Sequence, residues 1–392
     1  MDINRTLTTM TRMKLAAAAA LSSLALLTGC ATPLAGKTPD EATRKVMLQN
    51  WQNASYNFDA QIGFDKLAFT DVDSDGGAKS AKPDIADIID QVGRSIRVNV
   101  SGAVDVPTGR VEAIPELRFE RRNLMSSIKV PLQFHAQDMS LLVDPSAVDL
   151  FLPSLRKQSG KFIRAKLPAE MASQIPLKAM YQAMPKIIDD AYAQADKQAF
   201  SFQPLDAYAG EIGAHYKLRM DLSREQEQKL TLQMLEGLAK VAREQAKPST
   251  DKPGEDKSGA EAMIRLVQGL VKLDPVSGDK SRTVSDIYAS RGGDLLALRQ
   301  KVHIEASEFS GDAYVNVRYS HYGKPQFVYQ LSENDIVDFD KLDLPDWLKD
   351  TDKLLPGEHA EAPAAAAPAE PQAQAAQPQA KPKKKRKARR AQ

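Results

Sequence analysis

Residues 56–64 read Tyr-Asn-Phe-Asp-Ala-Gln-Ile-Gly-Phe and carry an apolar residue at every second position. Successive side chains of a strand point to opposite faces of its sheet, so this alternation predicts a strand with one buried face. The same period of two returns further along the chain, over residues 96–106, 111–119, 128–134, 139–143, 211–222, 295–304, 312–319 and 326–331. Strands at this spacing predict a large antiparallel sheet.

Turns and one proline interrupt the predicted strands. The tripeptide at 107–109, Pro-Thr-Gly, and the dipeptide at 310–311, Ser-Gly, predict turns, because proline and glycine favour turn conformations. Pro115 lies inside the stretch 111–119 and has no backbone N–H to donate. We therefore expect that strand at an edge of the sheet or at a bulge.

Helical patterns are inserted between the strands. The sequence at 38–41, Thr-Pro-Asp-Glu, combines a cap, a first-turn proline and acidic residues, and it predicts the start of a helix. A capping box at 223–226, Ser-Arg-Glu-Gln, predicts a second helix. The stretch 169–196 contains two prolines and predicts two or three short helices, and 262–273 is amphipathic. The fold class expected is α+β.

The first 29 residues have the features of a secretory signal. A basic segment precedes the apolar residues 15–27, which are fewer than the roughly 20 residues that a membrane-spanning helix needs. Small residues then precede the only cysteine of the chain, in the sequence Leu27-Thr28-Gly29-Cys30. This tetrad resembles the bacterial lipobox, and the resemblance implies cleavage before Cys30 and attachment of lipid to its thiol.

Because Cys30 is the only cysteine, the chain cannot form an internal disulfide, a cysteine redox pair or a metal site built from several cysteines. Ala31 and Thr32 follow it, whereas in enteric bacteria an aspartate after the lipidated cysteine retains a lipoprotein in the inner membrane. The resemblance therefore implies an outer-membrane lipoprotein that faces the periplasm; the inner membrane and the cell surface stay open.

Residues 314–325 read Tyr-Val-Asn-Val-Arg-Tyr-Ser-His-Tyr-Gly-Lys-Pro. Together with the lipobox, an early helix and helices inserted between long strands, this segment resembles the half-barrel lipoprotein and lipoprotein-carrier superfamily, which includes LolA, LolB and LppX. The resemblance implies a curved, half-barrel-like antiparallel sheet packed against helices, with an apolar cavity that holds acyl chains. The helices at 223–273 exceed those of the smaller carriers.

The end of the chain differs in composition from the rest. Residues 347–380 are rich in Ala, Pro, Gln and Glu, a composition that predicts a disordered linker. The last twelve residues, 381–392, form a polybasic tail, whose eight cations are Lys381, Lys383, Lys384, Lys385, Arg386, Lys387, Arg389 and Arg390. Such a tail binds polyanions. A secretory signal excludes nucleic acid as the partner, which leaves lipopolysaccharide, cell wall or anionic lipid, or a solubilising role alone.

The sequence shows no catalytic constellation. Asp71, Asp73 and Asp75 match the opening of a calcium loop, but Lys79 and Lys82 occupy later ligand positions, so a solvated acidic loop is favoured and no metal or other cofactor is expected. The histidines lack metal-ligand spacing, and no glycine-flanked nucleophile is present.

These features divide the chain into a signal peptide (1–29), a lipidated tether (30–40), a half-barrel-like domain (41–346), a linker (347–380) and the tail (381–392). The leading hypothesis is a non-catalytic lipoprotein that binds a lipid or another amphiphile. The alternative is an envelope structural or assembly lipoprotein, whose tail contacts cell wall, lipopolysaccharide or anionic lipid. An enzyme is disfavoured.

Overall fold

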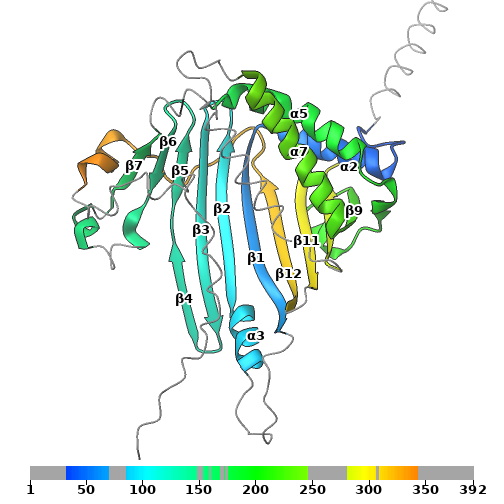
Figure 1. Cartoon of the computed structure of the whole chain (residues 1–392), viewed down its shortest axis with the longest axis horizontal. Helices are drawn as coiled ribbons and strands as arrows, with labels where there is room; N and C mark the ends of the chain where they lie inside the picture. The colour runs from blue at the N-terminus through cyan, green and yellow to red at the C-terminus, as the bar shows by residue number, and fades with distance from the viewer. Residues whose placement is uncertain are drawn as a thin grey trace, which may run out of the picture. The chain divides into compact units, whose positions relative to one another are not determined.

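The computed structural model describes residues 32–69, 85–147, 153–158, 160–167, 172, 175–245, 280–305 and 309–342. The chain separates into two compact units, Met1–Leu342 and Asp343–Gln392, and the second lies outside the described residues. The first unit is a mixed α+β fold on a large, mostly antiparallel sheet that does not close on itself (Figure 1). The predicted fold class and the large antiparallel sheet are thus confirmed.

The described residues contain a 13-stranded sheet. Its strands are β1 (Ser55–Phe69), β2 (Ile96–Asp105), β3 (Arg110–Arg121), β4 (Leu124–Lys129), β5 (Leu132–His135), β6 (Ser140–Val143), β7 (Phe162–Lys166), β8 (Phe200–Gln203), β9 (Tyr216–Ser223), β10 (Arg282–Ala289), β11 (Leu295–Glu305), β12 (Phe309–Ser320) and β13 (Ile336–Asp338). Their spatial order is β13-β7-β6-β5-β3-β2-β1-β12-β11-β10-β9-β8, with β4 beside β3. The short pair β13–β7 is parallel.

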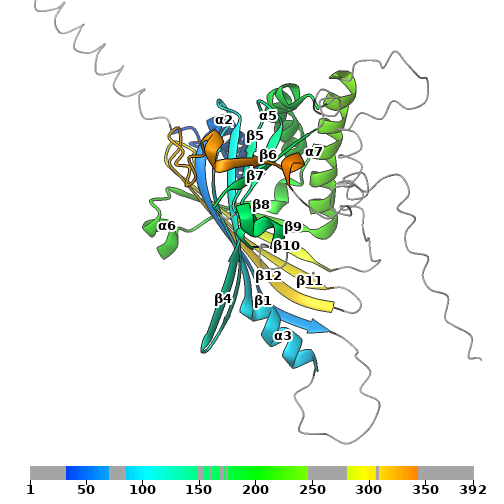
Figure 2. The same cartoon turned by 90° about the vertical axis from the view of Figure 1, so that its left-hand side faces the viewer.

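The helices lie on both sides of this sheet. They are α2 (Pro39–Asn53), α3 (Ile85–Ser95), α5 (Leu177–Ala193), α6 (Ala207–Glu211) and α7 (Arg224–Gln245), and short 3-10 turns join several elements. In the side view, α5 and α7 lie on one side of the sheet and α6 on the other (Figure 2).

Both predicted helix starts are confirmed. The backbone N–H of Thr38 donates to the Glu41 carboxylate at 3.2 Å. At α7, the backbone N–H of Ser223 donates to Gln226 at 2.9 Å, and the Gln226 N–H donates to the Ser223 hydroxyl at 3.3 Å. These reciprocal bonds satisfy backbone donors that have no partner within the first turn of a helix.

Pro115 lies neither on an edge strand nor at a bulge, contrary to the prediction. It lies within β3, between β2 on one side and β4 and β5 on the other. Its carbonyl accepts from the Val130 N–H at 3.0 Å, so its missing N–H faces the short break between β4 and β5. The predicted strand over 128–134 is interrupted at this same place, which removes the need for the lost hydrogen bond.

The prediction that prolines break the helix near 185 is also wrong. Helix α5 runs without a break from Leu177 to Ala193 with Pro185 inside it. Proline at this position leaves the Tyr181 carbonyl without its intrahelical donor. The indole N–H of Trp51 on α2 donates to that carbonyl at 3.4 Å, and the two aromatic rings pack with centroids 5.2 Å apart.

Three other strand predictions need correction. Residues 326–331 form a loop and not a strand, because the buried carboxylate of Glu112 accepts the N–H groups of Val328 and Tyr329 at 2.8 and 3.0 Å. The strand predicted from residue 211 begins at Tyr216, because Asp206 caps the short helix α6 before it. The predicted turn at 310–311 belongs to β12 and pairs with strands on both sides.

The main core lies between the helices and one half of the sheet. Val46 of α2, Ala191 of α5 and Leu230 of α7 are buried against Leu218 of β9 and Ile287 of β10. The strands on the other side of β1 contribute no residue to this cluster. Apolar burial therefore stabilises mainly the region of β8 to β11.

Candidate functional site

One face of the sheet is apolar over most of its width. The side chains of Tyr56 to Phe64 that alternate on β1 point to it, and strand pairing places further apolar side chains beside them: Val98 and Val100 of β2, Leu117 of β3, and Val315 and Val317 of β12. We call this surface the apolar face. The predicted strand is confirmed, but its apolar face is not fully buried, because Ile62 and Phe64 are exposed. The helices α2, α5 and α7 pack on the same face at β8–β11.

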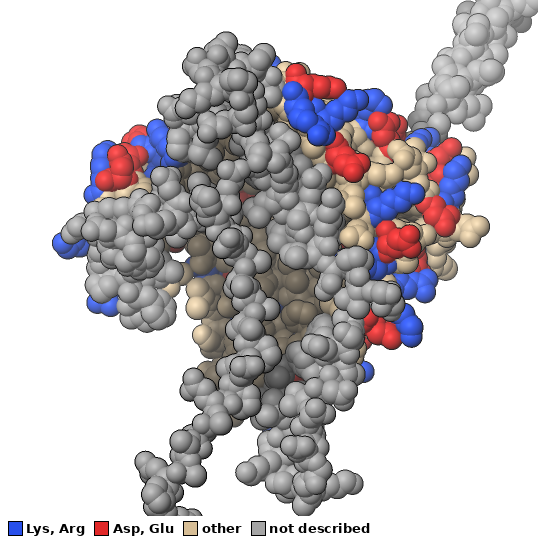
Figure 3. Space-filling view, in the orientation of Figure 1, with Lys and Arg blue, Asp and Glu red and all other residues tan. Residues whose placement is uncertain are grey.

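The apolar face continues beyond the part that the core covers. Ile62 and Phe64 of β1 are 38% and 36% exposed, and Leu117 of β3 is 49% exposed. In Figure 3 the part of the hollow that is visible between the grey atoms is mostly tan, and charged side chains gather over the helices on the right and at the left edge of the molecule. Monomeric soluble proteins rarely leave an extended apolar surface without a function.

A groove with a volume of about 880 Å³ lies where α5 approaches this face. Its walls come from the turn between β2 and β3, the connection between β5 and β6, and the start of α5, and its apolar lining includes Val106, Pro107, Val111, Phe134, Met139, Ile175, Leu177 and Tyr181. The polar part of the lining is small and comes mainly from Lys178 and three glutamines. This size and lining suit an apolar ligand with a small polar end.

Gly109 shapes one wall of the groove. It ends the β2–β3 turn with a φ of +65°, which glycine adopts without strain. Its N–H donates to the Val106 carbonyl at 2.9 Å, and its own carbonyl accepts from the Ala136 N–H at 2.7 Å. The two connections that line the groove are thereby held together.

The β3–β4 hairpin carries a second group of exposed apolar side chains. All residues of β4 are exposed, with Leu124 at 59% and Met125 at 66%. Arg121 and Arg122 stand at the turn beside them. An apolar tip flanked by cations is a combination that suits the boundary between water and a bilayer.

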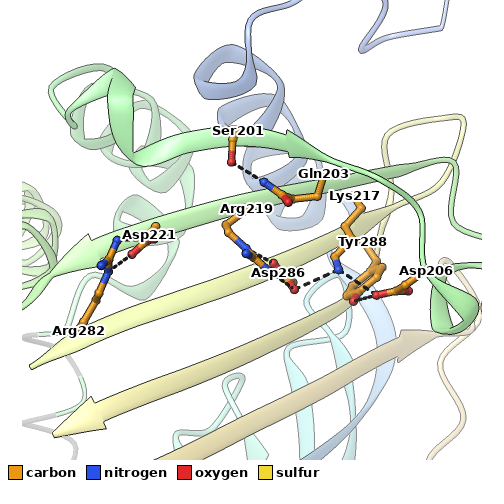
Figure 4. A network of polar contacts seen from close by, with 9 residues as sticks. All are labelled: Ser201, Gln203, Asp206, Lys217, Arg219, Asp221, Arg282, Asp286 and Tyr288. Carbon is orange, nitrogen blue, oxygen red and sulfur yellow. Dashed lines mark hydrogen bonds and ion pairs between the residues drawn. The ribbon is translucent and has the colours of Figure 1, made fainter.

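The opposite face of the sheet, which we call the polar face, carries an ion-pair network on β9 and β10 (Figure 4). Lys217 lies 2.8 Å from Asp206 and 3.2 Å from Asp286, and Arg219 lies 2.7 Å from Asp286. Tyr288 donates to Asp206 at 2.9 Å. The network ties the loop before α6 to the sheet.

The pKa values of these carboxyl groups favour the charged forms. The hydrogen bond from Lys217 lowers the pKa of Asp206 to about 2. Burial raises the pKa of Asp286, but hydrogen bonds from Arg219 and Lys217 outweigh that effect and leave it below its ordinary value.

The site residues that the sequence singled out lie outside the described residues. This holds for the lipobox Leu27-Thr28-Gly29-Cys30, for the eight cations of the tail between 381 and 390, and for the acidic loop with Asp71, Asp73 and Asp75. Within the described ranges, no three His, Cys, Asp or Glu side chains gather so that they would hold a metal ion. None of the helices in those ranges has the length and apolar character that a bilayer crossing requires.

The described chain begins at Thr32, inside the predicted tether of 30–40, and it is already packed there. The Thr32 hydroxyl lies 2.7 Å from the hydroxyl of Tyr216. Leu34 is only 2% exposed and belongs to the main core. From Thr32 onward the segment is therefore part of the folded unit.

Comparisons with family models, with curated proteins and with solved structures give no match for this chain. The resemblance implied an apolar cavity, but none of the residues that line the groove was a candidate site residue in the sequence. The groove residues come from turns and one helix end that are distant along the chain, and no local pattern marks such a convergence. The alternation in 56–64 did predict the apolar face.

Proposed function

We propose that this protein is a periplasmic lipoprotein with a non-catalytic role, anchored to the outer membrane through Cys30, and that it binds a lipid or another amphiphile. The observation that carries the proposal is the apolar groove of about 880 Å³, which opens beside an apolar sheet face that the core covers only in part. Acyl chains are the ligands whose burial such a surface favours, at about 0.8 kcal/mol per CH₂ group.

The arrangement of polar groups supports an amphiphile over a purely apolar ligand. Lys178, Gln182 and Gln137 belong to the groove lining, whereas the walls of the β2–β3 turn are mostly apolar. A ligand with a polar head would place its head against these groups and its chain along the apolar walls.

We also propose that the sheet has the half-barrel architecture of the lipoprotein superfamily named above. The open sheet with helices on its apolar face supports this proposal. The exposed apolar tip of the β3–β4 hairpin would then meet the bilayer from which an amphiphile comes.

The test measures binding of a fluorescent fatty acid to residues 30–392 carrying Cys30→Ser, so that the protein's own lipid does not compete. Ala179→Phe fills the groove from α5 without adding a charge, and we expect it to weaken binding roughly tenfold, which corresponds to about 1.4 kcal/mol. Ala193→Phe, at the exposed end of the same helix, is the matched control and should bind like the unsubstituted chain.

Native mass spectrometry of the same protein supplies a second measurement. Co-purified lipid, lost in Ala179→Phe and kept in Ala193→Phe, supports the proposal. A clean apo mass with no uptake of added fatty acid would refute it, as would equal binding by both variants.

A further inference from the structure

The polar face presents a row of planar polar side chains across its central strands. Gln61 of β1 lies directly opposite Asn99 of β2 and Asn316 of β12, and Asn316 lies opposite Arg299 of β11. The Gln61 amide donates to the Asn99 side-chain oxygen at 3.4 Å. Each of these amides has both donors and an acceptor, so the row offers hydrogen bonds of both kinds to a ligand.

Two adjoining hollows lie over this row. Their volumes are about 460 and 730 Å³, and Gln61 and Asn316 line both. We call the pair the polar hollow. Its lining is more polar than that of the groove: amide, guanidinium and carboxylate groups lie beside a smaller share of apolar side chains, such as Ile114 and Val284. It therefore suits a polar ligand better than an acyl chain.

Within the described ranges, three cations of the larger hollow have no acidic partner. Arg97, Arg299 and Lys301 are exposed, and no carboxylate of the described ranges forms an ion pair with them. Lys217 and Arg219 nearby are neutralised by Asp206 and Asp286, as Figure 4 shows. Asp65 is the other carboxylate that lines the larger hollow. Positive charge is therefore in excess in the larger hollow, whereas Lys129 and Arg318 are matched by Asp59 and Glu116 in the smaller one.

One tyrosine packs against a cation of this group, and a second lies between the other two. The Arg299 guanidinium stacks 3.9 Å above the ring of Tyr208, the residue that α6 places over the polar face. Tyr314 lies between Arg97 and Lys301 in the strand register, with Gly63 beside it. A Cβ atom on Gly63 would stand 2.6 Å from the Tyr314 hydroxyl oxygen, so the glycine lets this ring lie across β1 as part of the floor.

We propose that the polar hollow binds an anionic saccharide. Neighbouring sugar hydroxyls donate and accept at once, as the amides of Gln61, Asn99 and Asn316 do. A phosphate or carboxylate on the sugar would be held by Arg97, Arg299 or Lys301 through charge-assisted hydrogen bonds. The Tyr314 ring offers a flat surface to the C–H face of the sugar. This site lies on the face opposite the groove and does not depend on the amphiphile proposal.

Isothermal titration of residues 30–392 with Cys30→Ser tests this proposal. The ligands are glucose 6-phosphate, glucuronate, glucose and inorganic phosphate. We expect glucose 6-phosphate or glucuronate to bind at least about tenfold more tightly than glucose and inorganic phosphate, because only they engage both the amides and the cations. The stronger of the two identifies the anionic group. The basic tail is present in every protein tested, so its contribution cancels in comparisons between variants.

Substitutions locate the binding. Arg299→Ala and Arg97→Ala remove exposed cations, and Asn316→Ala removes an amide; each should weaken binding of the preferred sugar about tenfold. Arg243→Ala removes an exposed cation from α7 and should change nothing. Circular dichroism checks that each variant is folded. The proposal is overturned if neither anionic sugar binds, if inorganic phosphate binds as tightly as they do, or if none of the three substitutions weakens binding.

Discussion

Glu112 is fully buried on β3, yet it holds a segment that lies 216 residues further along the chain. Its carboxylate accepts the N–H groups of Val328 and Tyr329 and the side-chain amide of Gln133 at 2.8 Å. The Gln133 amide also donates to the Tyr329 carbonyl at 2.8 Å. A carboxylate with this many donors supplies the hydrogen bonds that a paired strand would otherwise supply.

We expect Glu112→Ala to lower the free energy of unfolding by about 2–4 kcal/mol, because it leaves the buried Gln133 amide and two partly buried backbone N–H groups without their charged acceptor. Glu120→Ala is the control on the same strand: its side chain is 50% exposed and its carboxylate lies 3.5 Å from Arg118, so its loss should cost less than about 1 kcal/mol. Urea unfolding followed by circular dichroism measures both. Equal losses would show that Glu112 does not stabilise the loop at 326–331.

At the scale of elements, α2 and α5 are joined by a hydrogen bond to the Tyr181 carbonyl. Pro185 leaves this carbonyl without a donor from its own helix. Trp51→Phe keeps an aromatic ring, smaller than the indole, but removes the N–H that reaches the Tyr181 carbonyl. We expect it to cost about 1 kcal/mol when Pro185 is present. In the background of Pro185→Ala the helix itself supplies a donor to that carbonyl, so the same substitution should cost less.

A double-mutant cycle of urea unfolding curves measures this difference, and we expect a coupling free energy of about 0.5–1 kcal/mol. Additive effects of the two substitutions would show that the indole bond and the proline are independent.

The contrast between the two helix starts and the two prolines shows what the sequence could and could not reveal. Thr38 and Ser223 cap their helices through residues three positions away, so a short stretch of sequence contains the whole interaction. Pro115 and Pro185 are tolerated because of Val130 and Trp51, whose positions depend on the folded sheet and on helix packing. No local pattern contains that information.

The candidate sites follow the same division. The alternation from Tyr56 to Phe64 depends on one strand, and it correctly indicated an apolar face. The polar hollow depends on the register that sets Gln61 beside Asn99 and Asn316. Alternation assigns residues to a face but does not fix how far one strand slides along another, so this row could not be read from the sequence.

At the scale of the whole molecule, the chain has a proposed lipid at one end and eight cations at the other. We expect residues 30–392 with Cys30→Ser to bind vesicles that contain phosphatidylglycerol, and the binding to weaken steeply as salt rises, because each cation near an anionic surface contributes about 1 kcal/mol.

Vesicle sedimentation at several salt concentrations measures this binding. A chain of the same length with all eight tail cations replaced by glutamine should lose the salt-dependent part. Binding that ignores both salt and the substitutions would eliminate the tail as a membrane contact, and with it the alternative function of an envelope assembly protein that grips lipid through the tail.

The burial of Leu34 has a consequence for how an anchored molecule would move. With lipid on Cys30, only Ala31 separates the anchor from the packed Thr32, a reach of about 7 Å at most. A flexible tether of ten residues would instead have an average end-to-end distance of roughly 18 Å. With so short a connection, the domain loses rotational entropy when the protein is anchored, and it does not lose it again each time its surface contacts the bilayer. Every later contact with the same bilayer is then an intramolecular event. The β3–β4 tip lies at the opposite end of the strands from Thr32, so it meets that bilayer only when the sheet lies along the membrane surface.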